Sequence, residues 1–151
     1  MGNQVEIAGQ LLVDANLCHW ADNTPANGAA SWPVWLSVLP FAKGQDNTAV
    51  GLFGPQGLLQ GRIMRTGESV TFPGLQVRVQ AVDYYKAHDK IGEIFNYFTK
   101  TVRRTEVTVR GKQYRVDNVS PSTTIIELGL DKETDLQNFS ANFFVRVTAL
   151  T

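Results

Sequence analysis

The sequence contains very little of what stabilises small exported domains or holds a chain in a membrane. Cys18 is the single cysteine among 151 residues, so no disulfide can form within the chain and no second cysteine can help it to bind zinc. There is no run of about 18 apolar residues, the minimum for a membrane span, and no charged leader followed by an apolar run at the N-terminus. We therefore expect a chain that is not exported by its own signals, makes no membrane contact and is kept in a reducing compartment.

Net charge is absent as well. Fourteen basic and fourteen acidic side chains cancel, and the apolar fraction of 43% is ordinary for a globular protein. With 151 residues the chain is long enough for one domain with a real core and too short for two ordinary ones. We expect a single domain over residues 1–151 whose main partner is not nucleic acid.

Histidine is scarce, which limits the metal and catalytic sites that the chain could build. Only His19 and His88 are present, too few for a convincing two-histidine metal site or catalytic dyad. We expect His88 to pack on the apolar side of a helix, with Asp89 pointing elsewhere, because adjacent helical residues do not share a face. His19 follows Cys18 directly, and we expect it to pack at a helix end, since a nucleophile and its base meet through the fold rather than by adjacency.

Two further motifs could suggest ligand binding, and both lack essential residues. Asp131, Glu133 and Asp135 alternate as in a calcium loop, but the glycine and the terminal glutamate of an EF-hand are missing. The glycines of GPQGLLQGR, residues 54–62, lack the lysine followed by serine or threonine of a phosphate-binding loop. We therefore predict a protein that is not an enzyme and has no catalytic residues, metal site or cofactor.

What the chain does contain is a change of hydrophobic period between Phe72 and Phe98. Up to Ala81 the apolar side chains alternate with polar ones, as in a strand with one buried face. From Tyr84 they recur every three or four residues, as on one side of a helix, and Asp83 is placed to accept hydrogen bonds from the first free N–H groups of that helix. A strand followed directly by an amphipathic helix predicts a sheet with a helix packed on it.

Similar patterns give the remaining elements. Apolar spacing indicates a first helix between residues 3 and 17, weakened by Gly9. Strands are expected at 32–40 and 47–54, which we expect to pair as a hairpin, at 103–119, which folds back at Arg110-Gly111, and at 125–131 and 140–150.

Together these elements predict an α+β domain. Its sheet would be mostly antiparallel, with about five to seven strands, and would be covered on one face by two helices. The polar side chains expected on the other face are Gln76, Arg78, Gln80, Arg146 and Thr148. Such a face is commonly solvated, but Arg78 and Arg146 are also candidates for contact with a neighbouring subunit or tube.

The segment 54–74 has the composition of a contact arm. It holds five glycines and two prolines in twenty-one residues, and a connection of this length without clear structure is unusual in a compact domain and often functional. We expect it to be mobile in the isolated subunit and ordered by a neighbour. The alternative is a hairpin packed on its own domain, in which RIMR and SVTF pair across Thr66-Gly67. The candidate contact residues in this segment are Leu58, Leu59, Arg62, Ile63, Met64 and Arg65.

The order of four sequence blocks in the second half of the chain resembles a known family. These blocks are FPGLQVRVQA, the helix YYKAHDKIGEIFNYF, the hairpin VTVRGKQYRVDNV and the closing IIELGLDKETDLQNFSANFFVRVT. They are similar to blocks of tail terminator, or minor capsid, proteins of long-tailed bacteriophages. The shared motifs are an alternating strand with a proline and charged residues, a G-x-x-Y hairpin, an L-G-x-D turn and an N-F-x-V-x-V strand. The resemblance runs from Phe72 to Thr148.

The resemblance implies a small α+β subunit that forms a hexameric ring on the last ring of tail-tube protein. Such a ring ends growth of the tube and offers a joining surface to the head. The implied partners are further copies of the chain in a homo-hexamer, the tail-tube protein and the head–tail connector protein, with DNA only as cargo passing through the ring. The protein would be assembled in the host cytoplasm and would reside in the virion, at the head–tail junction of the tail.

Two alternatives stay open at this point. A head–tail connector or a tail-tube protein would be another ring of the same machine, and a tube subunit would stack on itself where a terminator stops at one ring. A small hydrolase that uses His88 belongs to a different class of protein. The family itself has no catalytic residues to carry over.

Overall fold

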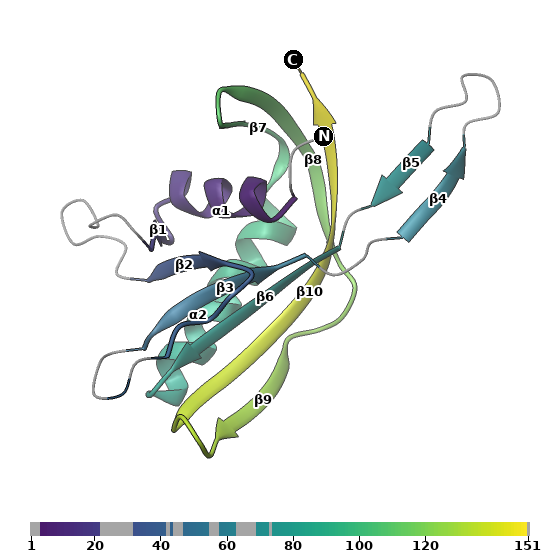
Figure 1. The fold of residues 1–151 in the computed structure, drawn as a ribbon. Coiled ribbons are helices and arrows are strands. Elements are labelled where there is room, and N and C mark those ends of the chain that lie inside the picture. The colour runs from purple at the N-terminus through teal and green to yellow at the C-terminus, as the bar shows by residue number, and fades with distance from the viewer. Residues whose placement is uncertain are drawn as a thin grey trace.

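The computed structural model of the protein describes residues 4–21, 32–41, 43, 47–54, 58–62, 69–72 and 74–150. These residues form an α+β fold in which helices pack against a curled, mixed sheet (Figure 1). The helices are α1 (Gln4–Asp14), α2 (Tyr84–Asn96) and the π-helical turn η2 (Tyr97–Thr101). The strands are β1 (His19–Trp20), β2 (Pro33–Leu36), β3 (Ala49–Phe53), β4 (Leu58–Arg62), β5 (Ser69–Phe72), β6 (Gly74–Ala81), β7 (Arg103–Val109), β8 (Lys112–Pro121), β9 (Ile126–Asp131) and β10 (Leu136–Ala149).

Helix α2 begins where its sequence pattern indicates. The Asp83 carboxylate accepts hydrogen bonds from the backbone N–H groups of Tyr85 and Lys86, at 2.9 Å and 3.4 Å, so the predicted N-cap is confirmed. The helix ends by widening into η2, after which Val102 N–H donates to the Tyr97 carbonyl at 3.1 Å. The chain then enters β7 in an extended conformation.

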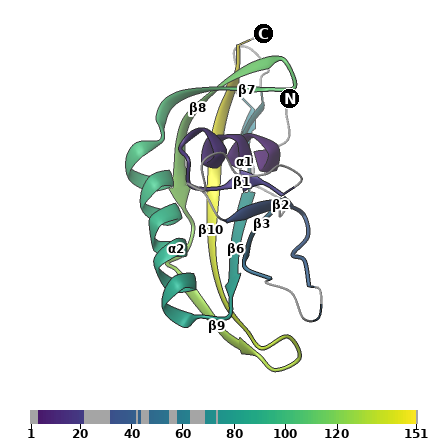
Figure 2. The ribbon, with the colours of Figure 1, turned by 90° about the vertical axis from the view of Figure 1, so that its left-hand side faces the viewer.

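Helix α1 lies between the two ends of the sheet. It contacts β2 and β3 on one side and β7 on the other, and Figure 2 shows it between β7 and β2, while α2 packs along β6 and β10. The helix is shorter than the predicted span 3–17. Gly9 does more than weaken it, because a Cβ atom at this position would lie 2.6 Å from the Trp20 ring. Glycine therefore lets β1 approach the helix closely.

Among the described residues the main sheet has eight strands in the order β1-β2-β3-β6-β10-β8-β7, with β9 also paired to β10. The pairs β1–β2 and β2–β3 are parallel, and the other pairs are antiparallel. The prediction of a mostly antiparallel sheet of fewer strands is therefore only partly right. The expected hairpin between 32–40 and 47–54 is wrong, since Val34, Trp35 and Leu36 run parallel to Val50, Gly51 and Leu52.

The β7–β8 hairpin agrees with its sequence signal. Val109 pairs with Lys112, and the two turn residues have positive φ angles, 50° at Arg110 and 77° at Gly111. This left-handed pair matches the right-handed twist of the flanking strands, which is why the Arg-Gly step marked the turn.

The core is one continuous cluster of side chains from α1, α2 and the strands. Its largest buried side chains include Phe98, Phe139 and Phe143, and the ring of Phe143 lies 5.4 Å from that of Phe98 and 5.5 Å from that of Phe95. The alternating apolar residues of β6 are all buried in it, as predicted: Leu75, Val77, Val79 and Ala81. The two helices and the central antiparallel strands thus share their apolar surfaces.

Lys90 is a buried charge that the helical pattern did not indicate. Its Nζ atom donates to the Leu17 carbonyl, lies 3.5 Å from the Glu93 carboxylate and stands 5.7 Å from the centre of the Trp32 ring. The side chain therefore ties the end of α1 to α2. A buried ammonium group requires such partners because an unpaired one would lose its hydration without compensation.

The segment 54–74 contains two strands rather than an unstructured loop. Strands β4 and β5 pair antiparallel, with Leu58 opposite Phe72 and Leu59 opposite Thr71, and form a separate two-stranded sheet. Figure 1 shows this hairpin standing away from the main sheet. The hairpin alternative is confirmed only in part, since β5 is SVTF as predicted, whereas β4 lies earlier in the chain and shares only Arg62 with RIMR.

Candidate assembly interface

The candidate interface lies on the outer face of the main sheet, which we define as the face that Arg78 shares with its cross-strand neighbours. Arg78 pairs with Ser140 of β10 and with Gly51 of β3, and residues directly opposite each other in a sheet point to the same side. Val77 and Val79, its neighbours along β6, are fully buried in the core on the other side. The predicted division of β6 into two faces is thus confirmed.

Part of the outer face is covered by the chain that leads from β2 to β3. Gln80 is only 5% exposed, and its side-chain N–H groups donate to the carbonyls of Pro40 at 2.7 Å and Asn47 at 2.8 Å. Leu39 lies over Gly51, where a Cβ atom would approach it to 2.7 Å. The expectation that Gln80 belongs to a solvated or subunit-facing surface is therefore wrong, because its own chain covers it.

Arg78 lies on the outer face beyond this cover and is poorly satisfied. Its Nε atom is buried and has no hydrogen-bond partner among the described residues, although its guanidinium carbon stands 5.9 Å from the centre of the Phe53 ring. The side chain borders an open pocket of about 300 Å³ whose other lining residues are Leu128, Gly129, Leu130, Asp131 and Asn138. A buried donor without a partner is costly in an isolated subunit, so this pocket is suited to an acceptor group from outside.

Strand β9 brings exposed apolar side chains to the rim of that pocket. Its register on β10 shifts between Asn138 and Phe139, so that Leu128 has no direct partner on β10, and Gly129 adopts a φ of 83° beside it. Leu128 and Leu130 remain 46% and 50% exposed. Bulges of this kind are common at sheet edges, and apolar residues beside an edge are frequent sites of contact with another chain.

A second part of the outer face is basic. Arg103 of β7, Asn118 of β8 and Arg146 of β10 form one row across three strands, because Arg103 and Arg146 both pair with Asn118. All three residues are exposed. A register shift between Arg146 and Val147 gives β8 an extra residue, Asp117, beside the row.

Asp117 links the neighbouring strands on this face. It accepts hydrogen bonds at 2.7 Å from the Arg115 Nε and the Thr148 hydroxyl. Burial opposes ionisation of Asp117, but these two hydrogen bonds and the nearby charges of Arg115 and Arg146 outweigh it, so the pKa of its carboxyl is lowered. The Asp117 carboxylate is thus held in place by its hydrogen bonds. Arg103 and Arg146 are the exposed cations of the row.

The predicted interface residues are only partly brought together. Arg78 and Arg146 share the outer face, but Arg146 lies six residues along β10 from the partner of Arg78, which corresponds to about 20 Å. Leu58, Leu59 and Arg62 lie in β4, and the backbone places them on the separate hairpin. Ile63, Met64 and Arg65 lie outside the described residues.

His88 is on the surface, so the prediction of a packed histidine is wrong. Its side chain is 57% exposed and stacks on the Tyr84 ring, with the ring centres 6.1 Å apart. The side of α2 that faces the core carries Ala87 and Ile91 instead. Its Nδ1 atom lies 3.5 Å from the Asp89 carboxylate, so Asp89 does not point elsewhere. Among the described residues no hydroxyl or thiol forms a hydrogen bond with His88, and the pair lies on open helix surface.

The described part of the chain has neither a metal-binding cluster nor a membrane-spanning helix. It contains no cluster of three or more histidine, cysteine or acidic side chains that could hold a metal ion. None of its helices is both long enough and apolar enough to cross a bilayer. No protein-family model matches the chain, and no curated protein matches its sequence.

Sequence reasoning missed the row formed by Arg103, Asn118 and Arg146. The basic residues of 103–115 are visible in the sequence, where acidic residues elsewhere offset them and a rim of contacts to another protein stays open. Charge counted over short windows, rather than over the whole chain, would have separated them. The pairing of Arg103 and Arg146 across β8 required the register of the sheet.

Proposed function

We propose that the protein is a structural subunit of a bacteriophage virion that assembles into a hexameric ring, caps the tail tube and provides the surface on which head and tail join. The order of motifs from Phe72 to Thr148 is the basis of this proposal. The further copies of the chain, the tail-tube protein and the head–tail connector protein are its partners, and DNA passes through the ring as cargo.

The hairpin β4–β5 is the observation that carries the proposal. It forms its own two-stranded sheet beside the main domain. A two-stranded hairpin is marginally stable in water unless something packs against it, so a neighbouring subunit or the tube is the natural support. The residues proposed for that contact are those named from the sequence: Leu58, Leu59, Arg62, Ile63, Met64 and Arg65.

The outer face gives the proposal a second contact surface. Arg78 has a buried Nε atom that lacks a partner within the described subunit, and Arg146 is exposed in a basic row. A ring in which each subunit uses two different surfaces satisfies such groups without a symmetric partner. Arg78 and Arg146 are therefore proposed to contact the next subunit or the tube.

Electron microscopy of the purified protein separates this function from the nearest alternatives. A terminator should form single closed rings with six-fold symmetry, whereas a tail-tube protein should stack into tubes. Stacked tubes, or a ring of another order that binds only the head, would favour the tail-tube or head–tail connector alternative. The exposed His88–Asp89 pair offers no specific support for the hydrolase alternative.

A further inference from the structure

Charge is segregated between two neighbouring stretches of the sheet, although the whole chain is neutral. Residues 103–115, which we call the basic segment, cover β7 and the first part of β8 and carry five basic side chains and one acidic one. Residues 126–135, which we call the acidic segment, cover β9 and the turn after it and carry four acidic side chains and one basic one. The neutral total conceals these two opposite surfaces.

The charges of the basic segment are only partly neutralised within the subunit. Arg110 lies 3.1 Å from the Glu6 carboxylate, and Arg115 bonds Asp117. Arg103 and Lys112 are exposed and form no ion pair with any described residue. The segment therefore presents unneutralised positive charge to solvent.

The carboxylates of the acidic segment form no ion pair with the described residues. The carboxylate of Asp131 accepts a hydrogen bond from the Glu133 backbone N–H, and that of Glu127 lies 3.4 Å from the Tyr84 hydroxyl. No ion pair joins Glu127 or Glu133 to a basic side chain of the described residues. Both acidic side chains are exposed.

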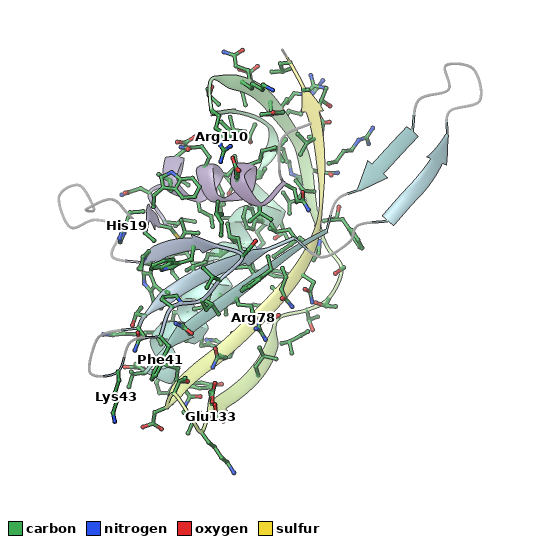
Figure 3. The ribbon with its side chains drawn as sticks, in the orientation of Figure 1. His19, Phe41, Lys43, Arg78, Arg110 and Glu133 are labelled. Atoms are coloured by element: carbon green, nitrogen blue, oxygen red, sulfur yellow. The ribbon has the colours of Figure 1, made fainter. Side chains whose placement is uncertain are left out.

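The two segments cannot neutralise each other within one subunit because they lie at opposite ends of it. Figure 3 shows Arg110 at the end near α1 and Glu133 at the opposite end, by the turn between β9 and β10. Between them both β9 and β8 pair with successive parts of the long strand β10. Two complementary surfaces at opposite ends of one subunit fit a head-to-tail contact between copies.

We propose that the acidic segment of one copy docks on the basic segment of the next. The occupant of each surface is thus a second copy of this chain, chosen because the two segments carry net charges of opposite sign and similar size. The proposal rests on the proposed function only in using further copies of the chain as the partner. Repetition of such a contact gives a closed ring where the rotation per step fits a whole number, and an open filament where it does not.

Apolar groups near each segment would add contact area to the charge pairing. On the acidic side Ile126, Leu128 and Leu130 are 38%, 46% and 50% exposed along β9, for which the described residues supply a partner on one side only. On the basic side Leu150 is 40% exposed, and its backbone N–H donates to the Gln113 carbonyl at 2.9 Å, which fixes it beside β8. Exposed apolar groups bordered by charge are typical of protein interfaces.

Charge reversal on each segment tests the proposal. The first variant carries Arg103→Glu and Lys112→Glu, and the second carries Glu127→Lys and Glu133→Lys. These positions avoid the positive-φ residues Arg104, Arg110 and Asp135. A control variant, with Lys86→Glu and Lys100→Glu on the exposed surface of α2 and η2, changes the net charge as much as the first.

Sedimentation velocity at low and high salt is the measurement. Wild-type protein should assemble, and either reversed variant alone should need at least about a tenfold higher concentration to assemble at low salt. An equimolar mixture of the two reversed variants should assemble, because each contact then joins opposite charges, and so should a single chain that carries all four substitutions. The control variant should behave as wild type.

Several results would overturn the docking proposal. These are a wild-type chain that stays monomeric at its highest soluble concentration in low salt, a mixture that fails to assemble although both variants are folded, and a control that assembles as poorly as the reversed variants. If a reversed variant does not fold, the neutral pair Arg103→Gln with Lys112→Gln replaces it, and its assembly should be weaker than wild type and less sensitive to salt.

Electron microscopy of the same samples distinguishes this proposal from the function it extends. Single rings that form in wild type and equally in both reversed variants would leave the ring standing and remove this contact. Charge-rescued assemblies that are filaments rather than rings would support the contact and remove the terminator function.

Discussion

Replacing Arg78 by methionine should separate folding from assembly, because the two respond in opposite directions. Methionine keeps most of the aliphatic stem of arginine and removes the guanidinium group, whose Nε is buried without a partner among the described residues. A site that serves only the fold would lose stability on such a change. A site that is completed by a partner subunit would keep its stability on this change.

The magnitude follows from the contacts of the side chain. Relief of an unsatisfied buried donor should raise the free energy of unfolding by about 1–3 kcal/mol. Loss of the contact with the Phe53 ring, 5.9 Å from the guanidinium carbon, should lower it by about 0.5–1 kcal/mol. The net change expected for the isolated subunit is therefore between zero and about 2.5 kcal/mol of added stability. If a partner's acceptor reaches Arg78 in the ring, its loss should weaken assembly by about 2–5 kcal/mol.

Urea unfolding under conditions where the protein is monomeric measures the first effect, and sedimentation equilibrium measures the second. Arg146→Met is the matched control for stability, since Arg146 is exposed on the same face and its loss should change the free energy of unfolding by less than about 0.5 kcal/mol. The reasoning is refuted if Arg78→Met lowers the free energy of unfolding by more than about 1 kcal/mol and leaves assembly unchanged.

Three further predictions concern other parts of the fold. Gln80→Met should lower the free energy of unfolding by about 1–3 kcal/mol, because the carbonyls of Pro40 and Asn47 lose their donors. Gln76→Met on the same strand should change it by less than about 0.5 kcal/mol. Equal losses for the two variants in urea unfolding would show that the hydrogen bonds of Gln80 do not hold this chain segment on the sheet. Backbone amides of β4 and β5 should exchange with deuterium rapidly in the monomer and slowly in the ring, and strong protection in both samples would show that the hairpin is stable alone. Burial raises the pKa of Cys18 from 9.0 to about 12, so the unfolded chain releases the thiol proton at lower pH than the folded chain does. The free energy of unfolding should therefore fall by about 1.4 kcal/mol per pH unit above pH 9. Cys18→Ala should lose this slope, and an unchanged slope would show that Cys18 is not its cause.

Local patterns predicted the elements whose causes are local. The N-cap at Asp83, the turn at Arg110-Gly111 and the alternation of β6 each depend on residues that are close in the sequence. Hydrogen bonds to the first turn of a helix, positive φ at glycine and a period of two are all set within a few residues. These features could therefore be predicted from the sequence alone.

Features that depend on distant chain segments could not be predicted in the same way. The parallel pairing of β2 with β3 arises because the connecting chain crosses the outer face of the sheet, where Leu39 covers Gly51 and Gln80 bonds Pro40. Nothing in an alternating strand shows which of its polar residues another segment will cover. Similarly, the placement of His88 depended on the exact direction in which α2 packs, and a stripe as wide as the predicted one includes residues at its margin.

The candidate interface likewise has features that the sequence predicts and features that it does not. Arg78 and Arg146 were placed on one face by alternation alone, and the structure bears this out. The row that joins Arg146 to Arg103 depends on the register of three strands. The lack of a hydrogen-bond partner for the Arg78 Nε among the described residues depends on where other segments of the chain cover the sheet. Register and cover are properties of the whole sheet, so only the structure could supply them.

Labelling of intact virions tests the central claim most directly. An antibody against this protein, viewed by electron microscopy on phage particles that carry it, should mark one band at the head–tail junction and nowhere else along the tail. Label distributed along the tail would identify a tube subunit, and label at the distal tip, or none on purified virions, would contradict a ring that caps the tube at the head.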